Sequence, residues 1–282
     1  DWSSDVCSSD LVDVYNNATA TVCNDVTVDK NIMKPIEIDG LFAPAGSGFD
    51  NYGLKLFQYV DVKSVYDTAS GSYGIATGTI NSVVHFCGNT LVGEDLVGMN
   101  VYRGAYANAN EGDALACIIG DVTAKNNEIT IYGDGVGLTG GAQVKAEFVQ
   151  GNASATVDTL FCFSNNEIDM EDGMGIVAVG IDLGSDREDG GYASEAGLNI
   201  EFVIRDNCIS LSGEMGGFRA VPMPENVGIY VAVLSVSSGL EVDVTISGNT
   251  IEMINGVGIM VDKQWKGISY GVGSIVVIRN ND

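Results

Sequence analysis

The chain has 282 residues, with 38 acidic against 13 basic side chains and a formal net charge of −25 at pH 7. A chain this acidic repels nucleic acid and anionic membranes, so neither is expected as a partner. Val- and Ile-rich segments, 37 glycines and only 4 prolines predict an all-β chain, and no apolar run is long enough to predict a membrane span.

The first eleven residues, Asp1 to Leu11, read as the translation of a short-read sequencing adapter. We therefore interpret residues 1–11 as an artefact, set them aside from fold reasoning and infer a metagenomic fragment whose natural N-terminus is not represented. Residues 12–58 follow as an N-terminal irregular or capping segment, because Lys34 to Phe49 is rich in proline and glycine. Asn24 begins a weak copy of the phrase described next, so this segment could hold a degenerate coil.

From residue 59 onward one short phrase recurs at steps of roughly 40 residues, shortening to about 32 at the last. It reads Asn, any residue, then an aliphatic, and its asparagines are Asn89, Asn127, Asn166, Asn207, Asn249 and Asn281. Apolar residues alternate on both sides of each asparagine, as Phe161 and Phe163 do before Asn166, which predicts two half-buried strands joined at a bend. We expect the asparagine itself to occupy the bend, where its amide satisfies backbone groups and it tolerates the left-handed region.

A second phrase follows each copy: a glycine and then an apolar residue, as in Gly98-Met99, Gly137-Leu138 and Gly175-Ile176. Gly74-Ile75 looks like the same phrase in a degenerate coil that comes before the coil of Asn89. Another apolar residue two places on indicates a third strand. Three short strands that bend and return to the same point describe one coil of a solenoid, in which like residues stack about 4.8 Å apart.

Residues 59–282 therefore resemble the right-handed, single-stranded parallel β-helix proteins of the pectin-lyase-like superfamily, with three short strands per coil. We interpret the asparagine column as a structural Asn ladder. The last phrase stops at Asp282, which suggests a C-terminal truncation, and an uncovered coil is expected to self-associate or fray. The resemblance implies either an adhesin-like surface protein or an enzyme that cleaves polysaccharides.

The strongest candidate for chemistry is an acidic column that precedes the phrase glycines, formed by Asp95, Asp134, Asp172 and Glu225. Stacked coils would hold these carboxylates about 5 Å apart, where they repel one another unless a cation or protons intervene. Calcium suits such oxygen ligands, so Ca²⁺ is a possible but not a required cofactor. The alternative is that Asp simply begins a hydrated turn.

Loops are predicted after the third strands at Tyr106 to Ala114, Gln150 to Thr156 and Ser185 to Ala196. Because they occupy similar places in the repeat, they would gather on one face, as binding loops of solenoids do. Tyr102, Tyr106 and Tyr192 lie near them and are the candidate carbohydrate-binding residues, since tyrosine rings stack on sugars. Solvated, variable loops are the alternative interpretation.

Two function classes remain open. We favour an extracellular or cell-surface, adhesin-like repeat protein with a structural or carbohydrate-binding role, whose partner is carbohydrate or another cell surface. The alternative is a polysaccharide lyase or glycoside hydrolase of the same fold. No catalytic residue is assigned, because Arg205 beside Asp206 is the only lyase-like feature and no dense carboxylate group accompanies it. Three or more carboxylates converging with a Lys or Arg would favour the enzyme.

Overall fold

The computed structural model describes residues 6–15, 19–33, 51–64, 74–110, 112–148, 151–185, 194–213, 226–235, 240–265 and 275–282. Tyr192, Glu225 and the segment from Lys34 to Phe49 lie outside these ranges. The described residues contain no helix that could cross a membrane.

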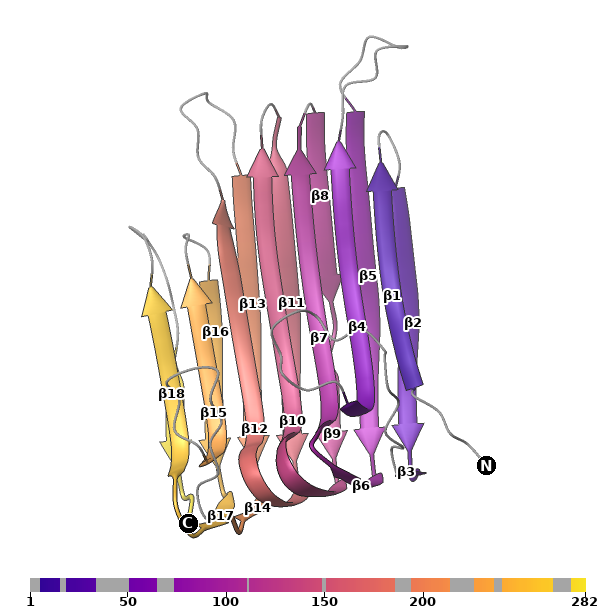
Figure 1. Cartoon of the computed structure of the whole chain (residues 1–282). Helices are drawn as coiled ribbons and strands as arrows, with labels where there is room; N and C mark the ends of the chain where they lie inside the picture. The colour runs from indigo at the N-terminus through magenta and orange to yellow at the C-terminus, as the bar shows by residue number, and fades with distance from the viewer. Residues whose placement is uncertain are drawn as a thin grey trace.

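The fold consists of two parallel sheets that lie face to face (Figure 1). The strands are β1 Val6–Tyr15, β2 Thr19–Asp29, β3 Ile32–Met33, β4 Asn51–Ser64, β5 Gly74–Cys87, β6 Thr90–Glu94, β7 Leu96–Ala109, β8 Gly112–Ile119, β9 Val122–Lys125, β10 Glu128–Phe148, β11 Ala153–Ser164, β12 Glu167–Ser185, β13 Ser194–Arg205, β14 Cys208–Leu211, β15 Asn226–Ser235, β16 Leu240–Ser247, β17 Thr250–Met253, β18 Val257–Trp265 and β19 Val276–Arg279. The first sheet contains β1-β4-β7-β10-β12-β14-β17, joined by β3, β6, β15 and β18, and the second contains β2-β5-β8-β11-β13-β16-β19, joined by β9. The predicted all-β, parallel architecture is confirmed.

Successive turns of the chain stack in register. Strand β11, for example, pairs residue by residue with β13 from Ala153 opposite Ser194 to Ser164 opposite Arg205. In β10 and β12 the part after the asparagine and the part after the glycine are joined by an irregularity between Ile131 and Asp134. The strands that follow the glycine phrase are longer than expected, because alternating burial continues through β7 as far as Ala109.

This alternation corrects the loop predictions. Tyr106 to Ala114 is almost entirely strand, since β7 ends at Ala109 and β8 begins at Gly112, and β11 already begins at Ala153 inside the predicted second loop. The segments are rich in Ala, Gly and Asn and therefore resemble loops. The alanines in and next to these segments are buried inward-facing residues: Ala107, Ala109, Ala114, Ala116, Ala146, Ala153 and Ala155. Small side chains fill the interior here without the β-branched signature of a strand.

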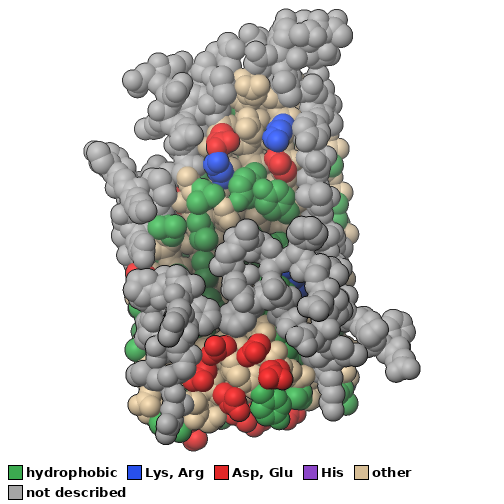
Figure 2. All heavy atoms as spheres, in the orientation of Figure 1, with side chains coloured by type: hydrophobic (Ala, Val, Ile, Leu, Met, Phe, Trp, Pro, Cys, Tyr) green, Lys and Arg blue, Asp and Glu red, His purple; other side chains and the backbone are tan. Residues whose placement is uncertain are grey.

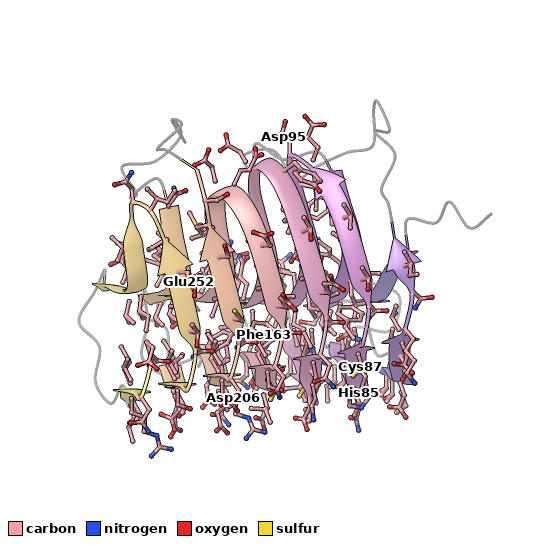
Figure 3. All side chains as sticks on the ribbon, turned by 90° about the horizontal axis from the view of Figure 1, so that it is seen from below. His85, Cys87, Asp95, Phe163, Asp206 and Glu252 are labelled. Atoms are coloured by element: carbon pink, nitrogen blue, oxygen red, sulfur yellow. The ribbon has the colours of Figure 1, made fainter. Side chains whose placement is uncertain are left out.

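The core is a continuous column of aliphatic and phenylalanine side chains between the sheets. Phe161 stacks on Phe202 of the next coil with ring centroids 5.2 Å apart, and it also contacts Phe163 at 6.3 Å. In Figure 3, Phe163 lies between the sheets, while Asp95 lies on one side of the coil and His85 and Asp206 on the opposite side. Like residues therefore stack on like along the axis, as the repeat predicted.

The asparagines of the repeated phrase form a hydrogen-bonded column. Asn166 accepts the backbone N–H of Asn127 at 3.1 Å and its Nδ2–H at 2.9 Å, both on Oδ1. Its own Nδ2 donates to Oδ1 of Asn207 at 2.9 Å and to the carbonyl of Ala124 at 2.9 Å. The same pattern runs through Asn89, Asn127, Asn207, Asn249 and Asn281. Each side chain thus links three coils.

The ladder begins at Asn31, which the sequence reasoning missed. Asn31 donates from both its backbone N–H and Nδ2 to Oδ1 of Asn89, at 3.0 and 3.2 Å. The copy assigned to Asn24 is wrong, because Asn24 pairs with Ser82 in the middle of the second sheet. The signal was available: Asn31-Ile-Met33 matches the phrase and follows the alternating strand β2.

The left-handed residue of the bend is the one before the ladder asparagine, not the asparagine itself. Positive φ angles of 50 to 68° occur at each such position: Lys30, Gly88, Asn126, Asn165, Asp206, Gly248 and Asn280. Gly, Asn and Asp tolerate this region best, which explains why they fill six of these positions. The ladder asparagine is thereby left free to use its side chain along the axis.

Glycine is needed in the second phrase because the backbone there passes close to the aliphatic side chain of the asparagine phrase in the next coil. A Cβ on Gly137 would lie 2.5 Å from the carbonyl oxygen of Gly175 and 2.7 Å from Cγ2 of Ile168. Two coils earlier the matching residue is Gly53, whose Cβ would meet the side chain of Leu91. Gly74 was assigned this role wrongly: it pairs with Gly112 at the start of a strand in the second sheet.

Candidate functional site

The most distinctive surface lies on the outer face of β4 and β7, where four aromatic side chains form a row. This aromatic row consists of Phe57, Tyr59, Tyr102 and Tyr106. Phe57 and Tyr102 lie with ring centroids 5.4 Å apart, and Tyr59 and Tyr106 with centroids 4.8 Å apart. The rings point outward because they alternate with inward-facing residues such as Val60, Val101 and Ala105.

Glycines let two of these rings lie against the sheet. A Cβ on Gly104 would lie 2.8 Å from Cδ2 of Tyr59, and one on Gly141 would lie 3.2 Å from Cδ2 of Tyr102. Tyr102 also donates from its hydroxyl to Oε1 of Gln143. The row is therefore held rigidly, which lowers the entropy lost when a ligand is bound.

Burial raises the pKa of the Tyr102 and Tyr106 hydroxyls, and the neighbouring tyrosines raise that of Tyr102 further. Both phenols therefore stay neutral through the physiological range and act as hydrogen-bonding groups. At the other end of the row, the Lys55 ammonium lies 4.0 Å from the ring centroid of Tyr52 and 4.9 Å from that of Phe57. These contacts fix the lysine over aromatic faces.

A shallow pocket of about 190 Å³ adjoins Tyr106 and carries charged and polar groups. Its walls include Asp61, Lys63, Asn108, Lys145 and Glu147. The Lys145 ammonium pairs with Glu147, and Asn108 donates from Nδ2 to Oε2 of Glu147 at 3.4 Å. Figure 2 shows this face, on which lysine and acidic side chains lie beside apolar ones.

Of the three predicted tyrosines, the structure places Tyr102 and Tyr106 on this face, and Tyr192 lies outside the described residues. Their partners Phe57 and Tyr59 come from β4, which the sequence analysis divided between the capping segment and the first coil. The signal was the alternation of the apolar residues Leu54, Leu56 and Val60 with outward-facing ones. The ring contacts depend on the register between β4 and β7 and could not be read from either strand alone.

The structure also shows how the residues of the predicted acidic column lie relative to one another. Asp134 pairs in register with Asp172, and its backbone N–H donates to Oδ1 of Asp95 at 2.9 Å. Burial, Asp172 and Asp95 raise the pKa of Asp134, in that order of size. In the described part of the chain, no three His, Cys, Asp or Glu side chains converge as metal ligands. Asp95 thus accepts a backbone amide, and Asp172 accepts from Nδ2 of Asn226 at 3.3 Å. Calcium binding stays a prediction.

A buried arginine is the largest polar feature that the sequence analysis overlooked. Arg103 is fully buried between the sheets. Its guanidinium donates to the carbonyl of Gly120, to Oγ1 of Thr159 at 2.9 Å and to the carbonyl and Oγ of Ser82 at 3.0 and 3.1 Å. Burial lowers its pKa to about 10. Alternation from Val101 to Ala105 places Arg103 inward and was the signal for it.

Arg103 ties the strand that bears Tyr102 to the opposite sheet. Its partner Ser82 exchanges hydrogen bonds with Gln58 at 2.6 and 2.8 Å, which links the same network to β4. Arg205, the lyase-like candidate, is exposed at the end of β13 in the second sheet and so belongs to a different sheet from the aromatic row.

Comparison with protein-family models, with curated proteins and with solved structures gives no match to this chain. The structure described above therefore defines the class as an all-β protein with two parallel sheets, in which successive turns of the chain stack in register.

Proposed function

We propose that this chain is a right-handed parallel β-helix of the pectin-lyase-like type, with three strands per coil, that acts as an extracellular or cell-surface, adhesin-like protein. Its ligand is carbohydrate, bound along the outer face of the long strands. The aromatic row carries the proposal, because four rigid rings beside hydrogen-bonding side chains suit the alternating apolar and hydroxyl faces of sugars.

The ligand is a neutral polysaccharide rather than an acidic one. The net charge of −25 repels polyanions, and the pocket beside Tyr106 balances Lys63 and Lys145 against Asp61 and Glu147. The rings lie on two neighbouring strands, with Tyr102 and Tyr106 four residues apart on β7, so the row extends about 13 Å along the strands and more than one sugar unit can be contacted at once.

The test is binding to a panel of soluble neutral and acidic polysaccharides, measured by affinity electrophoresis and calorimetry. Tyr102→Ala and Tyr106→Ala should each weaken binding roughly tenfold or more, since a stacked ring contributes about 0.5–1.5 kcal/mol in addition to the apolar area that it buries. Tyr132→Ala is the matched control, because Tyr132 is 53% exposed and lies outside the row. Equal losses from all three variants, or no binding to any glycan, would refute the proposal.

The pocket also favours one alternative, a polysaccharide lyase or glycoside hydrolase. It brings two carboxylates, Asp61 and Glu147, beside two lysines. An enzyme would shorten the bound polysaccharide, with new reducing ends for hydrolysis or unsaturated ends for elimination. Asp61→Asn and Glu147→Gln would then abolish cleavage while binding persists. Binding without cleavage supports the adhesin-like protein.

A further inference from the structure

The pocket beside Tyr106 carries an ordered set of charges. Its walls come from the outer face of three neighbouring strands, β4, β7 and β10. Val60 and Val62 are fully buried, so Asp61 and Lys63, which alternate with them on β4, point outward. The register of the strands places Asp61, Tyr106 and Lys145 in one row across the pocket and Lys63, Asn108 and Glu147 in the next. Each row therefore has a negative charge at one side and a positive charge at the other, in opposite order.

The charges of the pocket sum to zero, but they do not all pair with one another. The Lys145 ammonium pairs with the Glu147 carboxylate, which also accepts a hydrogen bond from Nδ2 of Asn108 at 3.4 Å. Among the residues that the structure describes, no carboxylate pairs with the Lys63 ammonium. Figure 2 shows basic and acidic side chains close together on this face. The pocket thus presents a cation at Lys63 and, beside it on the same strand, the carboxylate of Asp61.

This arrangement selects for a ligand that carries both charges. Successive outward residues of a strand lie about 6.6 Å apart, since a strand rises about 3.3 Å per residue. An ammonium and a carboxylate on one carbon or on neighbouring carbons bridge that spacing, with a hydrogen bond of about 2.8 Å to Asp61 and another to Lys63. A ligand with a single charge is attracted by one of these side chains and repelled by the other. The net charge of −25 also repels simple anions and acts far less on a ligand whose charges cancel.

We propose that this pocket binds the zwitterionic head of an α-amino acid, with the ammonium on Asp61 and the carboxylate on Lys63. The hydroxyl of Tyr106 and the amide of Asn108 supply further hydrogen-bonding groups in the same pocket. Its volume of about 190 Å³ is the space of roughly six water molecules in the liquid, which suits a group of this size. An amino sugar that bears a carboxylate presents the same chemistry. Binding here goes beyond the proposed carbohydrate binding and does not require it.

The test is a titration of the 282-residue protein with glycine, acetate and methylammonium at constant ionic strength, followed by NMR of the backbone amides of β7 and β10. We expect glycine to bind at about millimolar concentration and at least about tenfold more tightly than acetate or methylammonium. In a second arm muramic acid, an amino sugar with a carboxylate, replaces glycine. Tighter binding of muramic acid than of glycine would assign the head group to a sugar, and weaker binding would assign it to a free amino acid.

Two variants should change the selectivity of the pocket and not only its affinity. Lys63→Met removes the cation, so glycine and acetate should bind at least about fivefold more weakly while methylammonium binds more tightly. Asp61→Asn removes the anion, so acetate should bind more tightly although glycine binds more weakly. Lys125→Met is the control, because Lys125 is exposed on the outer face of the second sheet, and it should leave all three affinities unchanged. Melting curves establish that every variant is folded.

Three results would each overturn the proposal. They are glycine binding no tighter than that of acetate and methylammonium, parallel losses of glycine and acetate binding in Asp61→Asn, and equal effects of Lys63→Met and Lys125→Met. Failure of polysaccharide binding is a separate result, because Tyr102→Ala tests it without changing a charge of the pocket.

Discussion

Replacing one ladder asparagine tests how far the column stabilises the fold. Asn166→Ala removes the acceptor of two hydrogen bonds and the donor of two more, all at 2.9 to 3.1 Å and buried. The backbone N–H of Asn127 is left without a partner where water cannot reach it. Unsatisfied buried groups cost about 1–3 kcal/mol each, so we expect a loss of about 4 kcal/mol in the free energy of unfolding.

Asn281→Ala is the matched control, because Asn281 is the same side chain at the end of the column. Asn281 also accepts two bonds, from Asn249 at 3.0 and 2.9 Å, but it is only partly buried. Water can replace the lost partner there, so we expect a cost of about 1 kcal/mol.

The assay is urea unfolding of both variants, combined with hydrogen exchange of the Asn127 amide. Asn166→Ala should remove protection at that amide beyond the global loss of stability. Asn166→Asp adds a pH test: the ionised carboxylate would face Oδ1 of Asn207, which raises its pKa. Its stability should therefore recover as pH falls through that raised pKa, since the protonated form can donate. Equal costs for Asn166→Ala and Asn281→Ala, or an unchanged Asn127 amide, would refute the reasoning.

Four further predictions concern stability, each checked by thermal or urea melting. Gly137→Ala should cost roughly 3 kcal/mol or more, because its Cβ would overlap Ile168 and a backbone oxygen, and a loss under about 1 kcal/mol would contradict the close approach. Arg103→Ala should cost about 3–5 kcal/mol of stability, because it leaves the buried hydrogen-bond partners of the guanidinium unsatisfied. Arg103→Lys should recover only part of this stability, and full recovery would show that the planar, forked shape of the guanidinium is unimportant. Lys30→Gly should stabilise by about 0.5–1 kcal/mol because φ is 52° there, and a loss would count against strain at that residue. Asp134→Asn should stabilise the protein at pH 7 and have no effect below the ordinary aspartate pKa of 3.8, because a pKa that is raised in the folded state penalises the ionised form only at higher pH. Melting curves with calcium at matched ionic strength test the acidic column. A calcium-induced rise in melting temperature that survives Asp134→Asn would exclude Asp134 as a ligand.

The sequence by itself determined the repeat and which residues face inward. Asparagine and glycine phrases at a steady period, flanked by alternation such as Phe161 and Phe163, are local signals, since a strand shows its buried face through every second residue. The all-β, parallel, stacked architecture and the column from Asn89 to Asn281 could be predicted on that basis.

Tertiary structure decided everything that depends on neighbours in other coils. The first rung proved to be Asn31, the left-handed residue proved to precede the asparagine, and the alanine-rich segments proved to be strand. The contact between Tyr59 and Tyr106 and the hydrogen bonds of Arg103 to Ser82 and Thr159 likewise depend on which residues stack. The connections between coils vary in length, so the sequence alone does not fix which residues of neighbouring coils come together. That register is a property of the tertiary structure.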